Sequence, residues 1–276
     1  MGDNVRPLEF LGLDGFRWVA LVSAVLTLLT LAEVLTGHFR SGFPLRAQHA
    51  PFASGGLLVV AAVATVAAPS AQWASAALTA AGWLSIATGV IGVGYHHYYG
   101  IAEKAGGYKW LLHYLMYGAP QLAPLALSAS GALAVIAANG IAGRPAVLGI
   151  GLRTALLGTV AIALAGAVAQ AGILHYRGAF NNPLMYAPFT APLLAAAGSA
   201  WFIADPSAPL RSALTFLFVL TFVTGFVGVG MHLRGLDRQM GGLRVWLFNL
   251  LQGPPVWAPT MFSGFAVVGL AVVHLL

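Results

Sequence analysis

Eight histidines occur in this chain of 276 residues, and four of them recur at matching positions of its two halves. His38 matches His175, and His96 matches His232, at a separation of about 136 residues in each case. A neutral imidazole can ligate haem iron, the magnesium of a chlorin pigment, copper or zinc. The matched histidines therefore predict a cofactor or metal site. The alternative is that each histidine, at the end of an apolar segment, forms a hydrogen bond at the membrane interface.

Glycines precede two of these histidines on the same face of a predicted helix. Residues four and seven positions before a histidine share its face. Both positions hold glycine in each half, namely Gly89 and Gly92 before His96, and Gly225 and Gly228 before His232. A strip of glycines leaves a slot in which a flat macrocycle could lie against the backbone. Small residues also let transmembrane helices approach closely, so helix packing is the alternative explanation.

Arginines follow the other two histidines. Arg40 and Arg177 each lie two residues after their histidine. A guanidinium suits a haem propionate, a lipid phosphate or an anionic substrate, so both arginines are candidate cofactor-binding residues. The alternative is an interfacial arginine that extends its charge into the headgroup region.

One carboxyl group lies inside an apolar segment. Glu33 is about one turn inside the first segment, and Gln170 stands at the matching position of the second half. An intramembrane carboxyl is costly and is a functional candidate, here as a group that exchanges a proton with a quinone. The alternative is a protonated carboxyl that is bonded to a neighbouring helix.

These residues belong to a longer internal repeat. Residues 88–96 read TGVIGVGYH, and residues 224–232 read TGFVGVGMH. A Gly-Gly-x-basic turn and two prolines follow in both places. We interpret the chain as a tandem duplication with one repeat at residues 1–141 and the other at residues 142–276.

The composition is that of a membrane protein. Apolar residues make up 59% of the chain and charged residues only 7%, against roughly a quarter in soluble domains. About 20 apolar residues in a helix span a bilayer. The predicted fold is all-α, a polytopic membrane bundle of eight transmembrane helices in two tandem parallel four-helix repeats. The spans are expected near residues 17–37, 51–69, 73–97, 120–138, 152–175, 188–204, 213–232 and 255–276.

The expected topology brings the four matched histidines to one membrane depth. Four spans return the chain to its starting side, so the repeats are parallel and related by an axis along the membrane normal. The loops on the histidine side hold eight of the 13 basic residues, which favours that side as cytoplasmic. The connections 98–118 and 233–252 contain aromatic segments that are too short to span. We expect these segments to lie in the headgroup region or to re-enter the protein.

Several classes of function are excluded or disfavoured. The chain has no cysteine, which excludes disulfides, thiolate-bound iron–sulfur clusters and covalently attached haem. It has no basic run, so we expect no nucleic-acid partner. There is no catalytic triad, nucleotide-binding loop or metalloprotease motif, so we expect no catalysis by the chain alone.

The histidine layout is similar to that of membrane cytochrome b subunits and quinone-reactive anchors of respiratory enzymes, although no motif is shared. We therefore predict an integral membrane subunit of a larger redox complex, respiratory or photosynthetic, in a bacterial inner (cytoplasmic) membrane. Its partners are the lipid bilayer and other subunits. It would hold haem b, or position a quinone, near the histidines. Chlorin or copper are the other cofactors considered, copper because methionines lie nearby at Met116, Met185, Met231 and Met240.

Two alternative functions remain open. One is a structural docking subunit without cofactor, whose aromatic connections bind another protein or lipid. The other is a small-anion transporter with parallel repeats, in which Arg40 and Arg177 lie at the mouth of the pathway.

Overall fold

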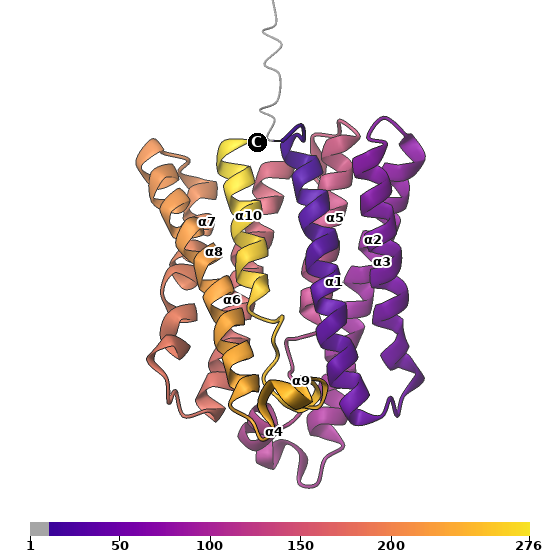
Figure 1. The fold of residues 1–276 in the computed structure, drawn as a ribbon. Coiled ribbons are helices and arrows are strands. Elements are labelled where there is room, and N and C mark those ends of the chain that lie inside the picture. The colour runs from indigo at the N-terminus through magenta and orange to yellow at the C-terminus, as the bar shows by residue number, and fades with distance from the viewer. Residues whose placement is uncertain (1–10) are drawn as a thin grey trace, which may run out of the picture.

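The computed structural model describes residues 11–276, which form a bundle of helices that run alongside one another (Figure 1). We call residues 11–141 the first half and residues 142–276 the second half. The longer helices of the first half are α1 (Gly15–Ser41), α2 (Ala50–Ala67), α3 (Gln72–His97) and α5 (Leu125–Ile141). Those of the second half are α6 (Leu152–Arg177), α7 (Ala191–Ala204), α8 (Ala208–Asp237) and α10 (Thr260–His274).

Shorter elements fill the connections. Two short helices, α4 (Leu111–Tyr117) and α9 (Trp246–Gln252), lie at the same end of the bundle as the C-terminal ends of α1, α3, α6 and α8 (Figure 1). The 3₁₀ turns are Arg46–His49, Gly107–Trp110, Pro183–Phe189 and Gly242–Val245, and a π turn covers Tyr98–Ala102. Strands β1 (Ala146–Val147) and β2 (Ile150–Gly151) form a small antiparallel hairpin between α5 and α6.

Six helical segments of the described chain are long and apolar enough to cross a bilayer. They are Gly15–Ser41, Arg46–Ala67, Gln72–Ala102, Leu152–Arg177, Pro183–Ala204 and Ala208–Asp237. The chain is therefore an integral membrane protein, as its composition predicts. Helices α5 and α10 are also apolar, but they have only 17 and 15 residues, fewer than the roughly 20 of a full crossing.

Prolines explain why α5 and α10 are short. The sequence predicts that these helices begin at Pro120 and Pro255, whereas they begin at Leu125 and Thr260. A second proline lies immediately before each observed start, where it caps the helix. Proline lacks an N–H group and keeps the residue before it out of the helical conformation, so the backbone is not helical between the two prolines.

The helices of each half contact one another in the same order. Helices α1 and α3 both contact α2 and α5, so they occupy opposite corners of a four-helix ring. In the second half, α6 and α8 both contact α7 and α10. The halves meet through α1 against α10 and through α5 against α6.

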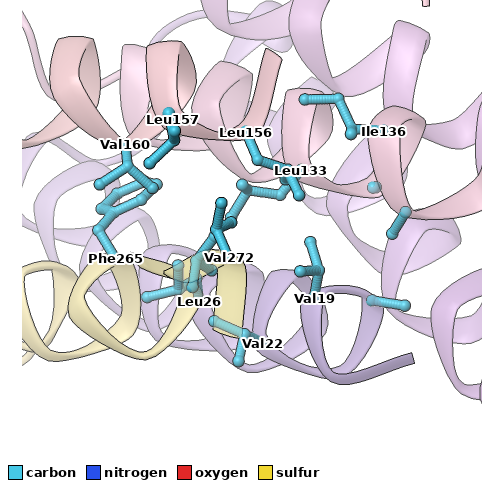
Figure 2. Packing of buried hydrophobic residues seen from close by; sticks show 14 of the residues in the cluster. Val19, Val22, Leu26, Leu133, Ile136, Leu156, Leu157, Val160, Phe265 and Val272 are labelled. Atoms are coloured by element: carbon cyan, nitrogen blue, oxygen red, sulfur yellow. The ribbon is translucent and has the colours of Figure 1, made fainter. Parts of the chain in front are cut away.

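The central core lies where the halves meet, and Figure 2 shows side chains from all four of these helices. The labelled residues are Val19, Val22 and Leu26 of α1, Leu133 and Ile136 of α5, Leu156, Leu157 and Val160 of α6, and Phe265 and Val272 of α10. Gly264 lets α10 approach α1, because a Cβ there would lie 2.3 Å from Cδ2 of Leu26. Close packing of this kind holds helices together in lipid, where hydrophobic burial gives little driving force.

In each half, a serine of the last long helix joins that helix to the one before it. Ser128 of α5 donates to the Ile86 carbonyl of α3, and Ser263 of α10 donates to the Phe222 carbonyl of α8. We expect Ser263→Ala to lower the free energy of unfolding by about 0.6 kcal/mol, the average for hydrogen bonds between transmembrane helices. Reversible unfolding in mixed micelles measures this loss. The matched control is Ser212→Ala, because Ser212 bonds only within α8. An equal loss in the control would contradict the prediction.

Candidate functional site

The four matched histidines lie at one end of the bundle. His38 and His175 are in the last turns of α1 and α6, while His96 and His232 are near the C-terminal ends of α3 and α8. These helix ends lie together with α4 and α9 (Figure 1). We call His38 and His96 the first histidine site, and His175 and His232 the second histidine site.

The histidines of α1 and α6 each bond the connection that follows their helix. Nδ1 of His38 lies 3.1 Å from the carbonyl oxygen of Gln48. Nδ1 of His175 lies 2.7 Å from the carbonyl oxygen of Met185. In each case the ring closes a loop of ten residues against the end of its own helix.

The histidines of α3 and α8 bond the non-helical segment that precedes α5 or α10. Nδ1 of His96 lies 2.9 Å from the carbonyl oxygen of Pro120, and Nδ1 of His232 lies 2.5 Å from that of Pro255. The Pro120 carbonyl also accepts from the backbone N–H of Ala123 at 3.3 Å. The imidazoles thus help to satisfy carbonyl groups that would be costly in lipid without a partner.

These bonds determine the tautomer of all four rings. A carbonyl oxygen only accepts, so the proton of a neutral ring must be on Nδ1. Within residues 11–276 each ring has this one hydrogen bond, so the lone pair of Nε2 is available. Metal-bound histidines nearly always donate their second ring N–H in this way, which orients the ring and raises its basicity.

Each site consists of two rings from different helices of one half, at the same end of the bundle. Because α1 and α3 occupy opposite corners of their ring of helices, the first site joins facing helices of a bundle, and the second site joins α6 and α8 in the same way.

Two phenylalanines that the sequence did not single out support the rings of α1 and α6. Phe43 meets His38 edge-on at 5.8 Å between centroids, and Phe180 meets His175 edge-on at 6.1 Å. Both phenylalanines have a positive φ, 49° and 47°, which is unusual for a bulky residue and costs of the order of 1–3 kcal/mol. The internal repeat contains this signal, because both lie five residues after their histidine.

The start of α5 occupies the space beside the glycines of α3. A Cβ on Gly89 would lie 2.2 Å from Oγ of Ser128, and a Cβ on Gly92 would lie 2.9 Å from Cβ of Pro124. The second half is alike, with Gly225 against Ser263 and Gly228 against Pro259. The predicted slot for a macrocycle is therefore filled by protein, and the geometry supports close helix packing at these four glycines.

The two candidate arginines contact the short helix of the opposite half. Nε of Arg40 donates to the carbonyl oxygen of Leu251 at the end of α9, over 2.6 Å. The guanidinium of Arg177 lies over the Tyr117 ring of α4, 5.3 Å from its centroid. These contacts link α1 to α9 and α6 to α4.

Glu33 and Gln170 also reach across to the opposite half. Oε1 of Glu33 accepts hydrogen bonds from the backbone N–H of Trp257 and, at 3.2 Å, from that of Ala258. Oε1 of Gln170 accepts from the backbone N–H of Leu122 at 3.0 Å. Glu33 thus bonds the segment before α10, which supports the alternative of a carboxyl that is bonded to a neighbouring helix.

Among residues 11–276, no three His, Asp or Glu side chains gather as a ligand set for a metal ion. No protein-family model, characterised protein or solved structure matches this chain. Function is therefore inferred from the two histidine sites themselves.

Proposed function

We propose that this protein is an integral membrane subunit of a redox complex, and that it binds haem b at its two histidine sites. The observation that carries the proposal is the set of four Nδ1-to-carbonyl hydrogen bonds, which leave four Nε2 lone pairs free at one end of the bundle.

A site with only two imidazoles is better suited to haem than to a metal ion without a porphyrin. The porphyrin supplies four nitrogen ligands, so one or two histidines complete the coordination of the iron. Each site offers two imidazoles from facing helices, and cofactor sites in helical bundles are built in this way. The bound haem would supply one-electron transfer. The chain would orient the histidines that hold the haem through the carbonyls of Gln48, Pro120, Met185 and Pro255.

We also propose that the chain consists of two tandem four-helix copies with eight transmembrane helices. Contacts between the halves are reciprocal, since α9 contacts α1 while α4 contacts α6. Reciprocal contacts are typical of a two-fold relationship, here along the membrane normal. The non-helical residues before α5 and α10 would add the length that these helices lack. Their backbone groups are satisfied by His96, His232, Gln170 and Glu33, as lipid requires.

The test is what co-purifies with the full chain. We expect protein from a bacterial cytoplasmic membrane, extracted in mild detergent, to carry two haem b per chain. Reduced-minus-oxidised absorption spectra and a pyridine haemochrome assay measure this content. Protein without haem bands that also fails to bind added hemin would overturn the proposal.

A structural docking subunit is the second candidate, favoured by the exposed aromatic surfaces of the histidine end. Trp110, Leu112 and Phe248 are 61%, 74% and 64% exposed. Aromatic residues are enriched at protein interfaces and at the headgroup level of membranes. A stable assembly that survives alanine substitution of all four site histidines, and that contains no haem, would favour this function.

A further inference from the structure

We infer that Glu33 and Gln170 are positioning residues, each of which supports the histidine site of the opposite half. Glu33 supports His232 of the second site, and Gln170 supports His96 of the first. This inference rests on the proposed function for its ligand, but its geometry concerns the protein alone.

The support acts through the segment before α10. The carbonyl of Pro255 holds Nδ1 of His232, and only two residues later the N–H of Trp257 is held by Glu33. Residues 253–259 lie outside the helices. Gly253 donates to Asn249, and the carbonyls of residues 257–259 accept from the first residues of α10, whereas residues 254–256 have no backbone hydrogen bond of this kind. The contact with Glu33, which comes from α1 of the first half, therefore adds a link to the opposite half close to the Pro255 carbonyl.

The first half has the corresponding arrangement before α5. The carbonyl of Pro120 holds Nδ1 of His96, and two residues later the N–H of Leu122 is held by Gln170 of α6. Neither contact is local, because 224 residues separate Glu33 from Trp257 and 48 separate Gln170 from Leu122. The duplication relates the two contacts, because Glu33 matches Gln170 and Trp257 matches Leu122 in the two halves.

A second anchor makes the support specific to α1 and α6. Arg40, seven residues after Glu33, donates to the carbonyl of Leu251. Helix α1 therefore bonds the chain of the second half both before and after Pro255. Arg177 of α6 contacts Tyr117 on the corresponding side of Pro120. Helix α1 also carries His38 of the first site, so each site depends on both halves of the chain.

Removal of the Glu33 carboxyl is expected to change the position of the His232 ring. Without Glu33, the N–H groups of Trp257 and Ala258 lose their partner, and an unpaired backbone group in lipid costs several kcal/mol. The segment would have to move to satisfy them, and the Pro255 carbonyl would move with it. Loss of such an outer-shell partner typically weakens metal binding 10- to 100-fold.

The experiment compares two single-site proteins. His38→Ala with His96→Ala leaves only the second site, and His175→Ala with His232→Ala leaves only the first. Hemin is titrated into each purified protein, and binding is followed by absorption. We expect Glu33→Ala to weaken hemin binding about 10- to 100-fold at the second site and to leave the first unchanged. Gln170→Ala is expected to do the reverse.

The conservative variant separates position from charge. Glu33→Gln keeps an acceptor oxygen and introduces the residue that the second half already uses at this position. We expect it to restore hemin affinity to within about twofold of the parent single-site protein. Persistent weakening would show that the carboxylate charge, and not its position, matters, and would overturn the inference.

A readout without haem separates this inference from the proposed function. In haem-free protein, ¹⁵N NMR of the imidazole reports the Nδ1 proton and its hydrogen bond. We expect Glu33→Ala to shift the His232 signals and to leave those of His96 in place. If wild-type protein binds no hemin but this shift is seen, the proposed function falls and the positioning role stands. Equal effects on both histidines, or none, would overturn the positioning role.

Discussion

Replacement of His96 and His232 by alanine is expected to abolish haem binding at both sites. Each variant removes a proposed ligand, whereas loss of an outer-shell partner already weakens metal binding 10- to 100-fold. We therefore expect a loss of more than roughly 100-fold at each site. Haem content per chain after purification, and hemin titration of the purified protein, measure the loss.

Two other histidines provide matched controls for this result. Nε2 of His97 lies 2.8 Å from the Tyr108 hydroxyl, and Nε2 of His274 lies 2.8 Å from Oγ1 of Thr215. Both rings therefore use the nitrogen that the site histidines leave free. His97→Ala and His274→Ala are expected to retain the wild-type haem content. A protein without His96 and His232 that still binds two haems would contradict the assignment of these ligands.

The long helices were predictable because their apolar runs are long. All six segments with sufficient length and hydropathy coincide with predicted spans. Their ends were less predictable. The seventh span was expected at residues 213–232, whereas α8 covers Ala208–Asp237. Charged residues such as Arg211 and Arg234 interrupt the apolar run, but they do not interrupt helical hydrogen bonds.

The sequence draws attention to the four matched histidines, but it does not predict the carbonyls that bond them. Internal repetition identified His38 and His96 without any structural information. The carbonyl that orients His96 is 24 residues away, and the one that orients His232 is 23 residues away. Such partners depend on how a non-helical segment folds back, and residue types do not encode that path.

The contact between Glu33 and Trp257 shows the same limit more strongly. The sequence identified Glu33 as an unusual carboxyl, but its partner lies 224 residues away in the other half. The positive φ of Phe43 was also not predictable, since bulky residues rarely adopt this conformation. Both features result from tertiary packing that overrides local preference.

Replacement of Gly89 or Gly225 by leucine is expected to destabilise the protein strongly. A Cβ at either position would lie within 2.8 Å of both a serine hydroxyl and a proline carbonyl oxygen of the facing helix. The backbone carbonyl cannot rotate away, so the two helices must separate. Overpacking typically costs about 1–3 kcal/mol, and we expect the upper end, about 3 kcal/mol for each variant. Reversible unfolding of haem-free protein in mixed micelles measures the change.

Two further glycines on the same helices provide the control and distinguish the two explanations of the strips. A Cβ on Gly94 or Gly230 would meet no atom within 4 Å, so leucine there is expected to change stability by less than about 0.5 kcal/mol. A macrocycle against the strip would give a different pattern, because Gly89→Leu would then lower haem content and leave the unfolding free energy of haem-free protein unchanged. That outcome would contradict close packing of α5 on α3 and would restore the slot that the sequence suggested.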